Sequence, residues 1–362
     1  MEFGIFSNGF RPHATAAAAY QQDLAEIVLA DQLGFRDAYI SEHHGEPIYV
    51  GKVDTLPVPE LLMCKAAALT KRIRMGAAVK LIHLTHPVDT AMQAAVADHV
   101  IGDSRYIFGF GTGFPNPFFA EERGLPFADR HERLRESLDL ILKCWTAPEP
   151  FDWDGKHWRG KGIVVTPQPL VAPHMPMATA TDTPAMIELA AARGYTLLSA
   201  QLETAASLRK KANIYLRAAN AAGRSVPLRN ITAARYVYLA DSRREAMDDL
   251  RDDINYELGF QMKRGLIRIV TSTFGLKLKG DTVTFDELAE AGLYCLGDPD
   301  TVAQQLRQFY DEAGGFGTLL IVAGKKWATP EKVERSMRLF IEHVAPKLRD
   351  LVPVRDPDSV AV

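Results

Sequence analysis

The sequence predicts an α/β protein, a single (β/α)8 TIM barrel with insertions at the C-terminal face of the barrel. Three observations predict this fold. Short apolar runs alternate with longer stretches of helical period, which is typical of β-α-β units around a parallel sheet. The chain has 362 residues, a length that such barrels reach as one domain when their loops carry insertions. The composition is 47% hydrophobic and 24% charged, which supplies one large core.

Eight apolar runs are the expected strands, and eight strands suggest a closed barrel. They are Glu2–Phe6, Asp37–Ser41, Ile73–Val79, Arg105–Phe110, Met175–Thr179, Thr196–Ala200, Arg235–Ala240 and Thr318–Val322. Helices between them show apolar stripes, clearest at 333–344. Proline stands where four of these helices should begin, at Pro87, Pro184, Pro299 and Pro330. These helices should cover the outside of the sheet.

Two segments interrupt this alternation. The segment 151–173, with a turn at Asp154-Gly155, is expected to be a hairpin before the fifth strand. The segment of about 255–297 follows the seventh strand, where an insertion covers the active site of a barrel, so we expect a lid. A loop with a helix of its own and no function is the alternative. Residues 1–350 should form one domain, with a C-terminal tail at 351–362.

Charge and cysteine content exclude several classes of function. The net charge is -3 with both signs mixed along the chain, so a nucleic-acid partner is not expected. Cys64, Cys144 and Cys295 are odd in number and lie in apolar stretches, which is typical of reduced thiols. No signal peptide or membrane-spanning run is visible. We therefore expect a cytoplasmic protein with no membrane partner.

The stretch 40–45, ISEHHG, lies where the second strand should end. Side chains at this point face the mouth of a barrel, where barrel enzymes keep their sites. An imidazole there can exchange a proton near neutral pH, which suits His43 or His44 to assist catalysis. A hydrogen-bonded histidine pair that closes a loop is the alternative interpretation.

The stretch 76–87, GAAVKLIHLTHP, runs from the third strand into a helix start. Its small residues, Ala78 among them, would let a flat aromatic ligand approach the backbone. His83 and His86 could suggest a metal pair, but no cysteine or carboxylate nearby completes a ligand set. We expect no metal, and a histidine beside a helix start to satisfy backbone groups.

Two further stretches follow the fourth and fifth strands. Residues 108–114, FGFGTGF, do not have the spacing of a dinucleotide-binding fingerprint, and we expect their glycines to leave open space near the cavity. Residues 178–186, ATATDTPAM, place Thr181, Thr183 and Ala185 at a helix start, where amide groups and hydroxyls can bind a phosphate. Asp182 should cap this helix or point away. A helix cap without any ligand is the alternative.

Several motifs in fixed order carry a resemblance across nearly the whole chain. They are FGIF at 3–6, SEHH at 41–44, LTHP at 84–87, FGFG at 108–111, GLPF at 124–127, the helix 130–145, GDPDTV at 297–302 and SMRLF at 336–340. Together they resemble the bacterial-luciferase-like superfamily of flavin-dependent monooxygenases, which are (β/α)8 barrels. Limonene-type and diketocamphane-type two-component enzymes look most similar, through 40–43 and 314–319.

The resemblance implies roles for particular residues. His43 matches the imidazole beside the reactive edge of the flavin, where it acts in acid/base steps. The Ala78-Val79 bond matches a place where such barrels hold a non-proline cis peptide against the flavin ring. The turn 181–185 resembles the phosphate-binding turn. Thr112 stands where luciferase has an arginine, and this departure puts tight retention of the flavin in doubt.

The resemblance also implies the reaction and its partners. We expect reduced flavin mononucleotide (FMN), supplied from outside, and O2 to oxygenate a small, mostly apolar substrate by hydroxylation, epoxidation or Baeyer-Villiger insertion. Phe10, Phe114, Phe118 and Trp327 are the expected substrate contacts. Since no nicotinamide fingerprint is visible, a separate NAD(P)H-dependent flavin reductase should supply the cofactor. The family implies a homodimer.

Other functions remain open at this point. Deazaflavin-dependent oxidoreductases use the same barrel and transfer hydride without O2. Related barrels also occur as flavin-binding proteins without turnover. A metal-dependent hydrolase is a more distant alternative. Cofactor titration, oxygen uptake and metal analysis would separate the three.

Overall fold

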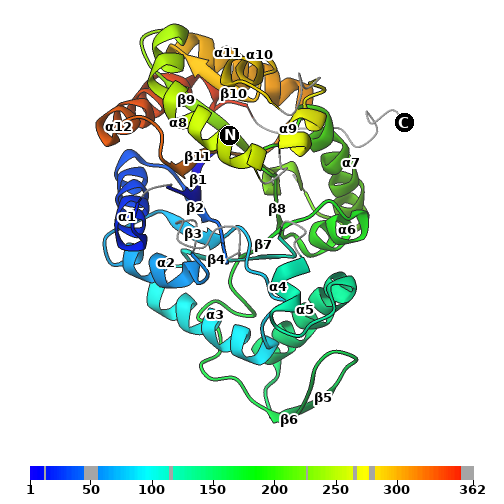
Figure 1. Ribbon diagram of the computed structural model, residues 1–362. Helices are drawn as coiled ribbons and strands as arrows, with labels where there is room; N and C mark the ends of the chain where they lie inside the picture. Colours follow the sequence, from blue (N-terminus) through cyan, green and yellow to red (C-terminus); the bar gives the residue numbers. More distant parts are fainter. Residues whose placement is uncertain are drawn as a thin grey trace.

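The computed structural model describes residues 1–11, 14–44, 56–113, 117–225, 227–263, 267–276 and 282–351. The mostly parallel sheet at its centre has helices around it, and Figure 1 shows the strands arranged as a ring inside the helices. This is the (β/α)8 barrel that the sequence predicts. The expected C-terminal tail lies almost wholly outside the described residues.

All eight predicted strands are present, although their ends differ from the prediction. They are β1 Glu2–Phe10, β2 Asp37–Ile40, β3 Arg74–Ala77, β4 Tyr106–Gly111, β7 Met177–Ala180, β8 Thr196–Leu198, β9 Thr232–Leu239 and β11 Thr318–Lys325. Within the described residues these strands follow the order β9-β11-β1-β2-β3-β4-β7-β8, and each pair is parallel. Their carboxyl ends therefore meet at one face.

The two ends of this strand order, β8 and β9, meet through little hydrogen bonding. In the described part of the chain, one parallel bridge joins Leu197 to Ile231, and the amide of Ser199 donates to Thr232 Oγ1 at 3.2 Å. No full ladder is formed there, in contrast to β1, which pairs with both β2 and β11. The ring is thus closed by its weakest contact.

Helices cover the outside, as expected. They are α1 Ala16–Leu33, α2 Pro59–Ala67, α3 Pro87–Ile101, α4 Pro117–Glu121, α5 Arg130–Thr146, α6 Pro184–Arg193, α7 Ala205–Ala221, α11 Pro299–Ala313, α12 Pro330–Leu339 and α13 Ala345–Leu348. Pro87, Pro184, Pro299 and Pro330 each begin a helix, which confirms that prediction. Proline suits this position because its missing N–H has no partner in the first turn.

The inside of the ring is filled by side chains. They form a buried cluster of Tyr39, Val79, Leu81, Leu84, Ile107, Ala120, Ala178, Leu198, Ala234 and Leu320. A larger apolar cluster lies between the strands and the surrounding helices. The barrel is therefore a packed core, and a site is expected above it at the carboxyl ends of the strands.

The segment after β9 differs in detail from the predicted insertion of 255–297. It contains α8 Arg243–Lys263, α9 Ile267–Thr273, α10 Phe285–Glu290 and a ninth strand, β10 Tyr294–Gly297. β10 pairs in parallel with the second half of β9. The predicted insertion therefore starts inside a helix and ends with a strand of the sheet.

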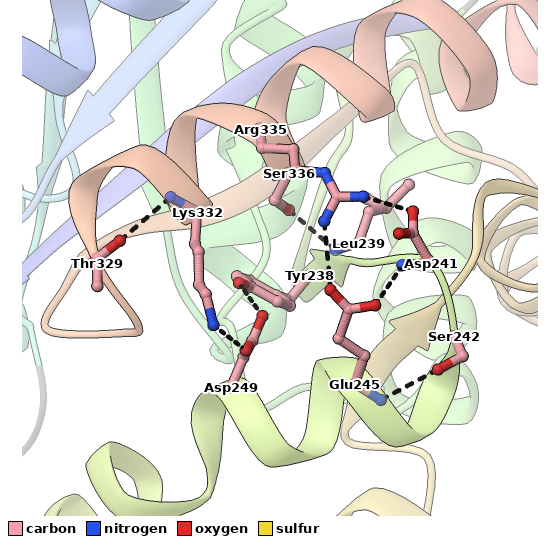
Figure 2. A network of polar contacts seen from close by, with 10 residues as sticks. All are labelled: Tyr238, Leu239, Asp241, Ser242, Glu245, Asp249, Thr329, Lys332, Arg335 and Ser336. Carbon is pink, nitrogen blue, oxygen red and sulfur yellow. Dashed lines mark hydrogen bonds and ion pairs between the residues drawn. The ribbon is translucent and has the colours of Figure 1, made fainter.

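A network of polar contacts fastens α8 to α12 (Figure 2). The hydroxyl of Tyr238, at the end of β9, donates to Asp249 of α8 at 2.9 Å, and Asp249 also pairs with Lys332 of α12. Arg335 of α12 pairs with Asp241 and with Glu245, the latter at 3.3 Å. The start of the inserted segment is therefore held against the barrel.

The excursion before the fifth barrel strand is a hairpin, as predicted. Strands β5 Phe151–Asp154 and β6 Arg159–Ile163 pair antiparallel and project from the body of the protein (Figure 1). Glu136 of α5 accepts hydrogen bonds from the amides of His157 and Trp158 at 2.9 Å, which holds the turn. Among the described helices, none is long and apolar enough to cross a membrane.

Candidate active site

His43 lies just beyond the end of β2, at the mouth of the barrel. Its partly buried ring makes a 2.9 Å hydrogen bond from Nε2 to the carbonyl oxygen of Asn8 in β1. Because a carbonyl can only accept, the ring proton is on Nε2 and Nδ1 carries the lone pair. Burial, with the charges of Lys325 and His44, lowers the pKa of His43 from 6.5 to about 4. The imidazole is therefore neutral at neutral pH and able to accept a proton.

The partner of His43 is positioned by an irregularity in β1. The pairing with β11 shifts register between Ser7 and Phe10, and Gly9 has a φ of 72°. Glycine adopts this left-handed conformation without a steric penalty. The side-chain amide of Asn8 also donates a hydrogen bond across the barrel mouth, from Nδ2 to Gln201 Oε1 at 3.4 Å. The ring of His43 is thus fixed to the backbone of β1.

The segment after β3 approaches β4 very closely. The Ala78-Val79 peptide bond is cis, as the resemblance implied. A Cβ on Gly109 would lie 1.7 Å from the carbonyl oxygen of Ala77, and one on Gly111 would lie 2.8 Å from Val79 Cγ2. The expectation that these glycines leave open space is therefore wrong. Glycine is required at these positions because the backbone of β3 fills the space beside Gly109, and the side chain of Val79 fills the space beside Gly111.

The candidate phosphate-binding residues are brought together by strand register. Gly111 of β4 pairs with Ala180 of β7, so Thr112 and Thr181 follow neighbouring positions at the same face. The amide of Thr183 donates to Thr181 Oγ1 at 3.1 Å, and α6 begins at the next residue. Ala185 lies in the first turn of α6, where amide groups point out of the helix.

Asp182 does not repel an anion at this helix start. It forms an ion pair with Lys211 of α7, and its side chain is mostly exposed. The prediction allowed it to cap the helix or to point away, and the second alternative is the one observed. The first turn of α6 is not capped by the side chain of Thr183 either.

The predicted substrate contacts fall into two groups. Phe10 and Trp327 are buried and lie near the end of β11. Lys325 Nζ lies 5.1 Å from the ring centroid of Phe10, and the ring centroids of Trp327 and Tyr236 are 5.4 Å apart. Phe118 is on α4, where its ring contacts Phe119 at 6.1 Å. Phe119 in turn lies 5.5 Å from His44. Phe114 lies outside the described residues.

Several charged residues at this face were missed by sequence reasoning. Lys325 at the end of β11 is buried, and its Nζ lies 2.6 Å from Glu257 of α8. Lys80, after β3, is buried between Glu42 and Glu60. A lysine inside an otherwise apolar strand or strand end was the available signal, because such a charge is buried only when it is paired.

His86 and His83, in the segment after β3, lie in different surroundings. His86 caps α3, where its Nδ1 accepts from the amide of Val88 at 3.3 Å. His83 is buried, and burial beside Arg133 lowers its pKa from 6.5 to about 3. Within the described ranges, no three His, Cys, Asp or Glu side chains are grouped to hold a metal ion.

The residues present fit a flavin mononucleotide. Thr112, Thr181 and the start of α6 would hold its phosphate, and the Ala78-Val79 segment would lie against its ring. His43 follows β2, the neighbour of β3, so it lies on the opposite side of that segment from the threonines. The arrangement can bind a flat phosphorylated ligand and keep a neutral base beside it.

Comparisons with known proteins agree with this geometry. The chain is 28% identical to limonene 1,2-monooxygenase of Rhodococcus erythropolis over 98% of this chain and 88% of the relative. It is 27% identical to 3,6-diketocamphane 1,6-monooxygenase of Pseudomonas putida, over 98% of this chain and all of the relative. These relatives are monooxygenases, and each is matched over most of its length.

Solved structures show the same fold. The oxygenating constituent of 3,6-diketocamphane monooxygenase of Pseudomonas putida, in complex with FMN, superimposes with a TM-score of 0.82 at 24% identity, covering 96% of this chain and 98% of the other. An F420-dependent secondary alcohol dehydrogenase has a TM-score of 0.69 at 16% identity, covering 96% and 99%. Residues 1–315 match the sequence profile of the luciferase-like monooxygenases. The chain therefore belongs to the luciferase-like monooxygenase family.

Proposed function

We propose that this protein is the oxygenase component of a two-component system, which uses externally supplied reduced FMN and O2 to oxygenate a small, mostly apolar substrate. The observation that carries the proposal is a neutral, backbone-fixed His43 on one side of the Ala78-Val79 segment, with Thr112 and Thr181 on the other. Relatives that oxygenate limonene and diketocamphane support the substrate class.

The chain's own residues would bind, orient and shield. Thr112, Thr181 and the first amides of α6 would hold the phosphate, as helix starts commonly do. When bound, reduced FMN supplies the electrons that activate O2. His43 Nδ1 would accept or return the proton that moves during oxygen transfer. The apolar interior of the barrel would keep water away from the reacting atoms.

The first part of the inserted segment supports its role as a lid. Phe260 of α8 contacts Phe10 with ring centroids 5.5 Å apart, and Glu257 of α8 pairs with Lys325. These contacts bring α8 to the ends of β1 and β11, where the substrate is expected. We include in the proposal that this segment covers the site during turnover.

A separate NAD(P)H-dependent flavin reductase is part of the proposal. The relative from Pseudomonas putida is described as an oxygenating constituent, and a trigonelline monooxygenase relative from Acinetobacter baylyi, 26% identical over 68% of this chain and 67% of the relative, is described as an oxygenase component. Such components depend on reduced flavin made elsewhere. If a separate reductase oxidises NAD(P)H, this chain needs no nicotinamide-binding motif of its own.

The proposal is tested by His43→Ala. Purified protein is given chemically reduced FMN, air and a panel of cyclic ketones and monoterpenes, and products are measured. The variant should bind FMN within about threefold of the wild type and form product at least about 100-fold more slowly, a range typical of lost acid/base catalysis. Equal product formation by both proteins would remove His43 from the mechanism, and no product from the wild type would contradict the proposed reaction class.

Hydride transfer with a deazaflavin is the second candidate, favoured by the fold shared with the F420-dependent dehydrogenase. The same titration, repeated with F420 and with FMN, separates the two. A monooxygenase should bind FMN more tightly and consume O2. Tighter binding of F420, with alcohol oxidation in the absence of O2, would establish the alternative.

A further inference from the structure

A buried cluster of charged side chains lies beside His43 at the carboxyl ends of β2 and β3. Lys80 Nζ lies 3.1 Å from Glu60 Oε1, in the first turn of α2, and 4.0 Å from Glu42 Oε2. The three side chains are only 7%, 8% and 4% exposed, in that order. Charges this deeply buried are stable only as a group, because each has lost its hydration.

The cluster has one cation for two carboxylates. The Oε2 atoms of Glu42 and Glu60 are both buried, and neither accepts a hydrogen bond from a described residue. Tyr106 of β4 interacts with both carboxylates and Cys64 of α2 with Glu60, and burial raises the pKa of both groups, so both are neutral. The ammonium of Lys80 is therefore the charge that makes two buried carboxylates tolerable at this place.

The cluster reaches His43 through Glu42. Glu42 Oε1 accepts a hydrogen bond from the amide of Leu81 at 3.1 Å and another from His44 Nε2 at 2.8 Å. Arg123 donates to the other ring nitrogen of His44 at 3.3 Å. Glu42 and His44, the neighbours of His43 in the chain, are therefore both held by hydrogen bonds. One of these bonds comes from Leu81, in the segment that carries Val79.

We propose that Lys80 is a positioning residue: shared between Glu42 and Glu60, it holds the His43 loop against the Ala78-Leu81 segment and shields His43 from the charge of Glu42. The inference rests on the proposed function only in that His43 is the group that handles the proton. Lys80 itself touches neither substrate nor cofactor in this assignment.

The charge argument gives the direction of the first test. Glu42 raises the pKa of His43, while Lys325 of β11 and His44 lower it and the Asn8 carbonyl accepts its proton. In Lys80→Met the carboxylates lose their cation, so the titration of His43 should move upward by about one pH unit. Histidine ring signals, followed by NMR against pH without flavin, measure this shift.

A compensating variant separates charge from general damage. While both carboxylates stay ionised, Lys80→Met changes the cluster from one net negative charge to two, and Lys80→Met/Glu60→Gln returns it to one. The double variant should fold, and its His43 titration should return toward that of the wild type. Its rate of product formation should remain at least about tenfold below that of the wild type, because the positioning contact of Lys80 is still missing. Its affinity for FMN should change less than about threefold.

Arg74→Met is the matched control. Arg74 and Asp37 stand on the same two strands at their opposite ends, with Arg74 Nε 2.7 Å from the buried Asp37 Oδ1. This variant also takes a cation from a buried carboxylate, which keeps Arg36 as its second partner at 2.6 Å, so it should lower stability modestly. It should leave the titration of His43 unchanged, because the change lies at the far face of the barrel.

Two results would overturn the proposal. One is a folded Lys80→Met with both the His43 titration and product formation at wild-type values. The other is product formation at the wild-type rate by the double variant Lys80→Met/Glu60→Gln. This second result decides the matter if Lys80→Met alone does not fold. Because the NMR titration needs neither flavin nor O2, it can succeed or fail independently of the monooxygenase assignment.

Discussion

At the scale of single residues, the environment of His43 links structure to pH. Its pKa is lowered from 6.5 to about 4, mainly by burial. Between these two values the unfolded chain binds a proton that the folded chain does not, so stability falls as pH falls through this window. The same burial keeps the ring neutral near pH 7, so its Nδ1 lone pair is available, although the lowered pKa makes the ring a weaker base.

This predicts a measurable difference between the wild type and His43→Gln. The variant should lose less stability between pH 6.5 and pH 4, with a slope flatter by up to about 1.4 kcal/mol per pH unit. Urea unfolding at several pH values measures both slopes. Identical slopes would mean that the histidine is not neutral in the folded protein.

Thr112 supports a second prediction about cofactor binding. Thr112→Arg places a guanidinium at the position that follows Gly111, next to Thr181 in the strand register. FMN should bind about tenfold more tightly, since hydrogen bonds to a charged group are stronger than neutral ones. Riboflavin, which has no phosphate, is the control in the same titration. Equal tightening of both ligands would place the phosphate elsewhere.

At the scale of elements, the sequence predicted what periodicity and turn chemistry control. The eight barrel strands, the hairpin at 151–163 and the four helices that begin at proline are all present. β10, Tyr294–Gly297, was missed because it lies inside the stretch 255–297, which was assigned as a whole to an insertion. α8 was divided wrongly because the predicted insertion began at Asn255, in the middle of that helix.

The candidate site was predictable in part, and for similar reasons. Residues that end strands can be located from sequence, so His43, Thr112 and Thr181 were placed on the correct face. The charged cluster could not be located, because Lys80, Glu42 and Glu60 come from three elements and meet only in the folded chain. The glycines of β4 were misinterpreted because close backbone approach has no signature that differs from open space.

The contacts in Figure 2 predict how the inserted segment is held. Tyr238 is buried and donates to Asp249, so Tyr238→Phe should lower the free energy of unfolding by about 1.5–3 kcal/mol, as expected for a hydrogen bond to a charged group. Arg335→Ala removes ion pairs between largely exposed side chains and should cost less than about 1 kcal/mol. Chemical denaturation compares them. A larger loss in the arginine variant would show that the exposed pairs anchor α8.

At the scale of the whole molecule, exposed apolar side chains bear on the expected homodimer. Leu61, Leu69, Val96 and Val100 are 71%, 56%, 47% and 57% exposed, on or beside α2 and α3, which pack against each other. Apolar side chains gathered on neighbouring helices are typical of a contact surface. A two-fold dimer would bury the same surface in both copies.

The dimer is tested by Leu61→Glu. If this surface joins two copies, the variant should sediment as a monomer at concentrations where the wild type is a dimer. Its thermal stability as a monomer should be little changed, because Leu61 contributes almost nothing to the core of its own chain. Exposed Glu121→Gln serves as a surface control. Unaltered sedimentation of the Leu61 variant would place the contact elsewhere.

The bridge between Leu197 and Ile231 has a consequence for where the barrel opens. A ring of strands opens first where fewest hydrogen bonds must break, and among the described residues β8 and β9 are joined by this bridge and the hydrogen bond from Ser199 to Thr232. Brief parting of the two strands would therefore open the interior from the side of the barrel, away from the mouth where the candidate site lies.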